Sequence, residues 1–456
     1  MPAAEQAPVP AVQPPPVAQT TPQTPPAAQI PPPAQPVPPA GKTISLTLEQ
    51  AVATAMSCHP DVISAQAAAV RAQAAAVQER ALRWPQLTLE LNATAAKGLE
   101  RTVETGGEPI ITAGDVNYIR NADVALTYTI FQSGLSEQIR QAETLAAAQL
   151  LGIPDAQRLL GYQVTQTYYN ILAQKQVTRA LLQSLAASER HREEVQARID
   201  AGTAPRSDLL PVEVEVAQAR LLSVQAETNL ETSIAALKAL LLIPPQDQVE
   251  LADLLPESLS VPGLNDLLCL AETNRPDIAA QKLNIRAAEL GTDVAKTQAG
   301  VQFFADATAN YGRHTGETGE QWTLQAGASY PLFDAGSSKA GVTSAQAAEV
   351  QAQERLASLR LNMQRDVESA LLALNQSKVA TEVAAVGTAS AESSMAAAEA
   401  RYREGLAIIL EVTDAQVQLL QAQVAEIQAR YNQTLALAQL RYATGAEIPT
   451  PNGENK

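Results

Sequence analysis

The sequence has few of the residues from which catalytic and metal sites are built. Its 456 residues include only two cysteines and three histidines: Cys58, Cys269, His59, His191 and His314. Their spacing matches no zinc motif, and two cysteines cannot build a disulfide framework, although one bridge remains possible. No nucleophile elbow and no glycine loop at a strand-to-helix turn is present. We therefore expect neither an enzyme nor a bound metal or cofactor.

Aromatic residues, positive charge and long apolar runs are also scarce. Aromatics make up 4% of the chain, and alanine dominates the 46% of hydrophobic residues, so closely packed helices are favoured. The 32 basic residues are outnumbered by 48 acidic ones, and this excess argues against a nucleic-acid partner. No run of about 18 apolar residues predicts a transmembrane helix. No signal peptide is visible at the start, which favours a cytosolic protein or a processed chain.

Proline marks one end of the chain, and long helical patterns follow it. Residues 1–40 hold 15 of the 29 prolines, which predicts a disordered leader or, as the alternative, a proline-motif ligand. Two segments, about 134–200 and 336–403, have patterns typical of coiled-coil-like helices, and each would span roughly 100 Å. The first is interrupted at residues 152–155 (Gly-Ile-Pro-Asp), where a helix would kink or restart.

The chain also repeats itself. Residues 58–62 recur at 274–278, residues 128–134 at 330–336, and residues 198–202 at 401–405, with spacings of 216, 202 and 203. A duplication explains these spacings if the first copy has the longer loop, at about 96–115 against 312–319. We predict a leader (1–43), a first repeat (44–250), a linker (251–262), a second repeat (263–447) and a tail (448–456).

Each repeat contains one hairpin of alternating strands, at 86–131 and 301–333. In the first strand Leu87, Leu89 and Leu91 face one way, and Thr88 and Glu90 face the other. Strands of about ten residues, and no more than about sixteen, with one apolar face are typical of a membrane β-barrel. A soluble sheet with one wet face is the alternative. The long helices are committed to each other, however, and nothing else could cover the apolar face.

Several side chains of these strands have expected places in a barrel. Trp84, Tyr128, Trp322 and Tyr330 have the positions of interfacial girdle residues. Glu90, Asp123 and Asp306 belong to the polar faces and would line the barrel lumen. Four strands cannot close a barrel, since the smallest have eight, so the protein must be an oligomer.

These features together resemble the TolC family of outer-membrane efflux proteins over residues 44–447. Residues 46–51 (Leu-Thr-Leu-Glu-Gln-Ala), followed by residues 59–61 (His-Pro-Asp), resemble its opening helix. Residues 330–336 (Tyr-Pro-Leu-Phe-Asp-Ala-Gly) resemble its strand-to-helix junction. The most specific match is residues 400–405 (Ala-Arg-Tyr-Arg-Glu-Gly) with residues 411–416 (Glu-Val-Thr-Asp-Ala-Gln), which resembles the hairpin at the periplasmic end of the long helices.

The resemblance implies a mainly α protein with a β-barrel part. It implies a homotrimer in the outer membrane, with four strands per protomer in a twelve-stranded barrel and long helices in a periplasmic tunnel. Such proteins are exit ducts of tripartite efflux or type I secretion systems. They contact outer-membrane lipid and dock onto a periplasmic adaptor and an inner-membrane pump. The alternative function is a soluble or periplasmic coiled-coil scaffold or adaptor.

The resemblance also implies site residues. Asp208 and Tyr402, with the acidic pair Glu411 and Asp414, correspond to polar residues that constrict the closed periplasmic end. In a trimer each becomes a ring of three. Some members tie the gate with an arginine two residues after the second hairpin glycine, where this chain has Ala407. The alternative is solvated charges on a helix surface.

Adaptor contact is implied for the two hairpin glycines and the arginines before them, Arg198, Gly202, Arg401 and Gly405. Plain turn chemistry is the alternative for the glycines. Two residues are expected to have no such role. Cys58 should be a buried small side chain in the first helix, and His314 should be exposed in a short loop.

Overall fold

The structure, a computed structural model, describes residues 42–102, 110–252, 261–314 and 317–446. All of them belong to one compact unit, Pro39–Lys456. The predicted leader, except residues 42 and 43, and the predicted tail lie outside the described residues, as does most of the predicted linker. No described helix is both long enough and apolar enough to cross a membrane.

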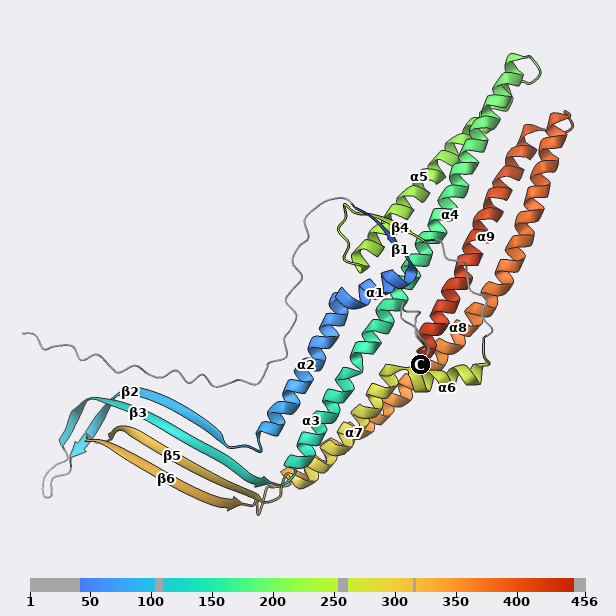
Figure 1. Ribbon diagram of the computed structural model, residues 1–456. Helices are drawn as coiled ribbons and strands as arrows, with labels where there is room; N and C mark the ends of the chain where they lie inside the picture. Colours follow the sequence, from blue (N-terminus) through green and yellow to red (C-terminus); the bar gives the residue numbers. More distant parts are fainter. Residues whose placement is uncertain (1–41, 103–109, 253–260, 315–316, 447–456) are drawn as a thin grey trace, which may run out of the picture. The chain divides into compact units, whose positions relative to one another are not determined.

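The two halves of the chain have the same order of elements (Figure 1). The first half contains β1 (Thr43–Leu46), α1 (Leu48–Cys58), α2 (Pro60–Ala81), β2 (Gln86–Thr102), β3 (Ile110–Gln132), α3 (Leu135–Leu150), α4 (Gly152–Asp200) and α5 (Leu209–Leu240). The second half contains β4 (Gln248–Leu251), α6 (Leu264–Asn274), α7 (Pro276–Thr297), β5 (Gln302–His314), β6 (Glu317–Ser329), α8 (Ser337–Arg403) and α9 (Ile409–Thr444). Two helices, a β-hairpin and long helices therefore occur twice.

Local sequence signals explain where the helices begin and end. Thr47 and Gln50 form a capping box at α1, and a proline occupies the first position of both α2 and α7. The predicted interruption near residue 152 is real, because α3 ends at Leu150 and α4 begins at Gly152. The second long segment is unbroken: α8 has 67 residues, or about 100 Å of helix.

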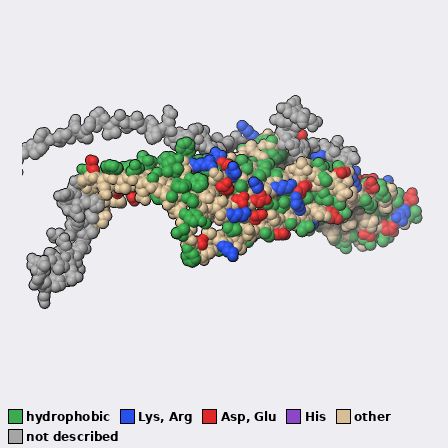
Figure 2. Space-filling view, turned by 90° about the horizontal axis from the view of Figure 1, so that it is seen from below, with side chains coloured by type: hydrophobic (Ala, Val, Ile, Leu, Met, Phe, Trp, Pro, Cys, Tyr) green, Lys and Arg blue, Asp and Glu red, His purple; other side chains and the backbone are tan. Residues whose placement is uncertain are grey.

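The four long strands form one antiparallel sheet in the order β2-β3-β5-β6. Its register places apolar residues opposite one another across all four strands, as in the row Leu89, Val124, Ala309 and Trp322. The next row, Glu90, Asp123, Asn310 and Gln321, is polar. The predicted division into two faces is therefore correct, and Figure 2 shows hydrophobic side chains gathered along one side of the strand region.

The polar face contains the acids predicted to lie there. Glu90 and Asp123 are cross-strand neighbours, and Asp306 lies between Thr127 and Gln325. Asn310 donates a hydrogen bond to Asp123. On the apolar face the exposed fraction is 66% for Leu89 and 79% for Trp322. No described helix covers these side chains, so the sheet exposes an extended hydrophobic surface.

Four sequence expectations about detail were wrong. The expected 312–319 loop is mostly strand, because β5 continues to His314 and β6 begins at Glu317. The strands are longer than ten residues, and β2 with 17 and β3 with 23 exceed the expected limit of about sixteen. Much of the predicted 96–115 loop is strand, because β2 and β3 stay paired past a bulge between Lys97 and Leu99. Cys58, the last residue of α1, is exposed rather than buried, and both cysteines are free.

A small core lies where β1 of the first half meets β4 of the second half. Strands β1 and β4 pair in parallel, and with α1, α4 and α5 they enclose Val52, Val164 and Leu237. Tyr168 is fully buried there, with its hydroxyl 2.7 Å from the carbonyl oxygen of Ala252 and 3.2 Å from that of Leu46. This hydroxyl ties α4 to both short strands. Strand β4 ends at Leu251, the first residue of the expected linker.

A buried ionic network joins the two repeats. Arg275 donates to both carboxylate oxygens of Asp277, at 3.1 and 2.6 Å, and its guanidinium also lies 3.5 Å from the Ala443 carbonyl oxygen. Arg158 of α4 donates to the Tyr442 carbonyl oxygen at 2.7 Å and to Asp155 at 2.8 Å. Two guanidinium groups therefore lie at the C-terminal end of α9, where the helix dipole favours positive charge.

The network affects the titration of Asp277. Burial alone would raise the pKa of this carboxyl, but hydrogen bonds and charge from Arg275, with the charge of Arg158, hold the pKa below its usual value. Because the pKa of Asp277 is lowered in the folded state, its ionised carboxylate stabilises the fold, and this stabilisation is fully present above the unfolded pKa of about 4. It is lost as the pH falls through the folded pKa.

We expect Arg275→Met to destabilise the fold by about 3 kcal/mol, because the half-buried Asp277 loses both of its guanidinium hydrogen bonds and keeps only the more distant cation Arg158, at 4.0 Å. The control is Arg286→Met, which removes an exposed ion pair with Glu289 and should cost no more than about 1 kcal/mol. Denaturant unfolding of the detergent-solubilised protein measures both. Equal midpoints for the two variants would contradict a stabilising role for the network.

The two faces of the sheet should respond differently to charge. Leu89→Arg or Leu324→Arg should cost about 2–4 kcal/mol if these sites lie near the middle of the bilayer. Thr88→Arg and Gln325→Arg are the matched controls on the polar face and should be far milder. Unfolding from lipid bilayers measures the difference. The barrel assignment is wrong if both faces respond alike.

Candidate functional site

The long helices end in two hairpins, and each bends at a glycine. Gly202 and Gly405 have φ angles of 72° and 74°, a left-handed conformation that favours glycine. In the first bend the amide of Thr203 donates to the carbonyl of Arg198 at 2.9 Å. In the second the amide of Leu406 donates to the carbonyl of Arg401 at 2.8 Å. Both bends are therefore the same Schellman motif, and each glycine has a backbone reason to be there.

Tyr402 of α8 lies where the two hairpins meet. It packs against Val195, Val212 and Ile409 on one side, and against Ala398 and Val412 on the other. The Arg198 guanidinium lies over its ring, 4.8 Å from the centroid, and the His191 ring is 6.2 Å away. The contacts with Arg198, Val195 and Val212 connect the second hairpin to the first.

The environment of Tyr402 keeps its hydroxyl neutral. Burial raises the pKa of Tyr402, and the carboxylates of Asp208 and Glu194 act in the same direction, against the opposing charge of Arg198. Asp208 is the last residue of a short 3-10 turn, Arg206–Asp208, directly before α5. The structure thus brings three of the predicted residues, Arg198, Asp208 and Tyr402, into one cluster.

The other predicted residues lie around the second hairpin. Glu411 is an exposed residue in the first turn of α9, and its carboxylate lies 3.4 Å from the Arg401 guanidinium. Asp414 follows one turn later and is also exposed. Within this chain Glu411 therefore pairs with a cation. Both acidic residues lie in α9, where an i, i+3 spacing puts them on one face of the helix.

A buried chain of hydrogen bonds near the bends was missed by sequence reasoning. The side-chain amide of Gln416 donates to the Ser188 hydroxyl at 2.8 Å, and Ser188 donates to Glu215 at 2.6 Å. These three side chains come from α9, α4 and α5 and are all buried. Glu215 could have been found, because it lies three residues after Val212 and four before Ala219, on the buried face of α5.

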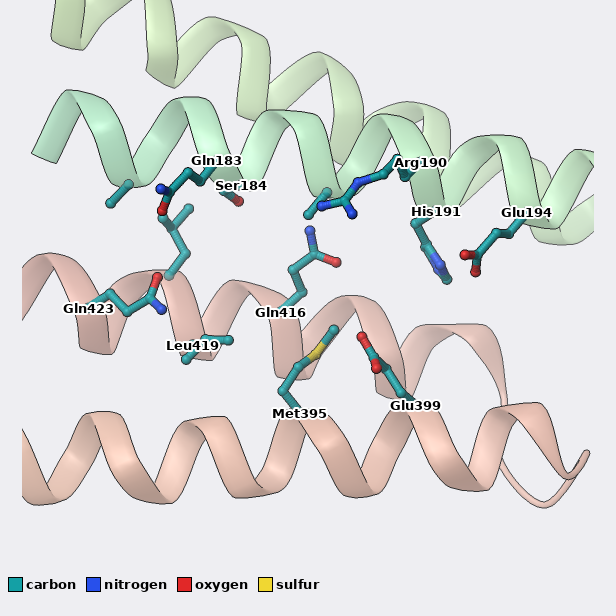
Figure 3. Close-up of a pocket in the computed structure, with 13 residues that line it drawn as sticks. Gln183, Ser184, Arg190, His191, Glu194, Met395, Glu399, Gln416, Leu419 and Gln423 are labelled. Carbon is teal, nitrogen blue, oxygen red and sulfur yellow. The ribbon is translucent and has the colours of Figure 1, made fainter.

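A groove lies beside this chain, between α4, α8 and α9 (Figure 3). It has a volume of about 360 Å³ and is lined by polar and charged side chains, including Arg190, His191, Glu194, Glu399 and Gln416. In the close-up His191 and Glu194 point from α4 toward Glu399 of α8. The groove therefore presents both signs of charge, beside apolar side chains such as Met395 and Leu419.

Two long helical hairpins joined to a sheet with one bare apolar face define a class of protein: an outer-membrane channel with a helical tunnel. The chain matches the family described as outer membrane efflux protein over residues 51–241 and 267–446, and it belongs to that family. It is an outer-membrane protein with a periplasmic helical part, and it serves as an exit duct of efflux systems. The family is one of channels rather than enzymes.

Individual relatives agree in sequence and in fold. The chain is 23% identical over 371 residues to outer membrane protein TolC of Vibrio cholerae, a match that covers 78% of this chain and 82% of the relative. The crystal structure of VceC from Vibrio cholerae is similar with a TM-score of 0.71 at 19% identity, covering 87% and 96% of the two chains. The crystal structure of the CmeC outer membrane channel of Campylobacter jejuni has a TM-score of 0.73 at 16% identity, and the match covers 88% of this chain and 85% of that one.

Removing the hydroxyl of Ser188 should weaken the contact between the hairpins. Ser188→Ala leaves the buried Glu215 without its donor, so we expect a loss of about 1–3 kcal/mol in local stability. Hydrogen exchange of the α4 amides around residue 188 measures this loss. Ser393→Ala is the matched control, because the Ser393 hydroxyl is exposed and bonds only within its own helix.

A second variant separates the lost hydrogen bond from a packing effect. In Ser188→Ala/Glu215→Leu the buried carboxylate is gone as well, so most of the lost protection should return. The hydrogen-bond chain has no stabilising role if Ser188→Ala exchanges like the control.

Proposed function

We propose that the chain works as a homotrimer whose hairpin ends form the closable periplasmic mouth of the duct. In this arrangement each protomer gives four strands to a twelve-stranded barrel. The observation that carries the proposal is the sheet itself, because it exposes an apolar face and has unpaired edges at β2 and β6. In a bilayer every backbone donor and acceptor at a sheet edge needs a partner, and ring closure supplies it.

The helices support the same assembly. Contacts order the long helices as α5, α4, α9 and α8, so that α5 and α8 lie at the outer sides of the row (Figure 1). Both outer helices carry exposed apolar residues at helical spacing, namely Leu210, Val214, Leu221 and Val224 on α5 and Leu372, Val379, Val383 and Val386 on α8. Packing α5 of one copy against α8 of the next would bury both stripes.

Asp208, Tyr402, Glu411 and Asp414 would then encircle the narrow end. Repetition by threefold symmetry places each acidic residue in a ring, which attracts cations. The duct acts passively, with the driving force supplied by a pump in the inner membrane. A soluble or periplasmic scaffold is not favoured, because a scaffold has no use for the bare apolar sheet.

The bends would contact a periplasmic adaptor. Gly202 and Gly405 are exposed at the ends of the hairpins, and Arg198 and Arg401 lie one turn before them in equivalent places. The two bends share one backbone geometry, so the hairpins of three copies would present six similar tips. A partner with repeated subunits could engage all of them in the same way.

The acidic rings give the test of the proposed mouth. Glu411→Ala/Asp414→Ala should reduce the cation selectivity of the reconstituted channel and any block by multivalent cations, because six carboxylates are lost from one constriction. Single-channel recordings in planar bilayers measure the reversal potential. The matched control is Glu382→Ala/Glu392→Ala on α8, which also removes two exposed carboxylates. An unchanged ion preference in the first variant would place the constriction elsewhere.

A further inference from the structure

The end of the sheet that joins the helices is unusually rich in large apolar side chains. The chain has only four phenylalanines, and all of them lie here: Phe131, Phe303, Phe304 and Phe333. Phe131 and Phe303 pack together with ring centroids 6.2 Å apart. Phe333, which follows β6, is 88% exposed, and Leu332 beside it is 92% exposed.

The segment that presents these two side chains is held in place. Asp334 accepts hydrogen bonds from the amides of Gly336 and Ser338 at 2.9 and 2.8 Å, and Ala335 has a positive φ of 54°. The corresponding segment of the first repeat stays in strand β3 as far as Gln132, because β5 pairs with it. Strand β6 ends at Ser329, opposite Gln302, the residue at which its partner β5 begins, and no described strand of the same chain pairs with its other edge.

The two hairpins have the same register. Gln86 lies opposite Thr127 in the first, and Gln302 lies opposite Ser329 in the second. Gln302 is 216 residues after Gln86, and Ser329 is 202 residues after Thr127, which are the two spacings of the sequence repeat. The two hairpins are therefore equivalent in backbone pairing over residues 86–97 and 302–313.

The joint between the repeats, β3 with β5, can then serve as a template for the joint between copies. In that joint Phe131 lies opposite Phe303 and Tyr128 lies opposite Ala305. The repeat spacings convert this register into one between copies: 202 is added to the residue number on β3, and 216 is subtracted from the residue number on β5. The result places Phe333 opposite Leu87, and Tyr330 opposite Leu89. Both new pairs are apolar, and both Leu87 and Leu89 belong to the apolar face of the sheet.

We propose that β6 and residues 330–333 of one copy pair with β2 of a second copy in the register that joins β3 to β5. Phe333 then packs on Leu87 of the neighbour, Ala328 lies opposite its Leu91, and Ser329 lies opposite its Glu90. The inference rests on the proposed oligomer and specifies how its sheet closes. It also explains why Leu332 and Phe333 are bare in a single copy.

Cysteine cross-linking tests the register. In a background with Cys58→Ser and Cys269→Ser, the pair Ala328→Cys and Leu91→Cys should form a disulfide on mild oxidation. Cβ atoms of opposite residues are about 4.5–5.5 Å apart, whereas those of diagonal residues are up to about 7–8 Å apart. The slipped pairs Ala326→Cys with Leu91→Cys and Tyr330→Cys with Leu91→Cys should therefore react much more slowly. A second pair, Phe333→Cys with Leu87→Cys, tests the end of the joint.

Each outcome has one meaning. Strands β3 and β5 separate β2 from β6 within a chain, so a disulfide from the matched pair joins two copies and gives a ladder of covalent multimers on non-reducing gels. Faster reaction of a slipped pair overturns the proposed register. The intrachain pair Val124→Cys and Ala309→Cys is the positive control, since these residues are opposite one another.

Failure of this inference can be told from failure of the oligomer. The mass of the cysteine-free protein in detergent, from light scattering, reports assembly without any cross-link. An oligomeric mass with a reacting control but no disulfide from any β6–β2 pair means that Phe333 faces lipid or another surface, and the proposal is wrong. A monomeric mass would overturn the oligomer itself.

Discussion

The rest of the structure depends on the requirement that a sheet in a bilayer have no unpaired edge. Lipid offers no partner for a free backbone amide or carbonyl, so only closed sheets and helices are tolerated there. One chain supplies four strands with an apolar face and leaves β2 and β6 open. Everything else in the fold has to be compatible with closure by other copies. The exposed stripes on α5 and α8 meet this condition, because they lie on the two outer helices of the row.

Duplication makes closure possible with a single kind of joint. If β6 pairs with β2 of the next copy as β3 pairs with β5, the hairpins of the ring are all joined in one way. The neighbouring hairpins then belong alternately to the same chain and to two different chains. Within the chain the repeats are also fastened away from the sheet. Arg158 from the first repeat and Arg275 from the second both donate to carbonyls at the end of α9. This fixes one end of α9, whereas its other end carries the candidate site.

Periodicity and spacing were sufficient to predict the long helices, the two repeats and the hairpins with one apolar face, whereas the trimeric tunnel and the twelve-stranded barrel were implied by the resemblance to the TolC family. The alternation of Leu87, Leu89 and Leu91 with Thr88 and Glu90 identified the faces of the sheet, and the register agrees with it. Strand ends were harder to predict. Glycines near residues 98 and 106 suggested a loop, but a β-bulge lets the described part of β2 stay paired with β3. Gly98 lies at this bulge, and a lone glycine in a strand pattern suggests a bulge as well as a loop, so the signal was present but was interpreted as a loop.

The candidate site was predictable in part, and the reason lies in what each residue contacts. Gly202 and Gly405 mark bends that depend on backbone conformation, which a sequence shows directly. The role of Tyr402 depends on Arg198, which is some 200 residues away in the chain, and the link between Gln416, Ser188 and Glu215 needs three helices to meet. No single segment contains that information. Of these features, only the burial of Glu215 could have been predicted from the sequence, because Glu215 lies on the apolar face of α5.

The same contacts bear on how the two hairpins hold together. This chain has Ala407 where some relatives have an arginine, so that position cannot supply an ion pair. The hairpins instead meet through the Tyr402 ring beneath Arg198 and through the buried amide of Gln416 on Ser188. Ion pairs between exposed groups weaken as salt rises, whereas buried hydrogen bonds and packed rings are screened much less. Contact between the hairpins should therefore depend little on ionic strength. Separating them leaves Ser188 bonded to Glu215 but takes the acceptor away from the Gln416 amide.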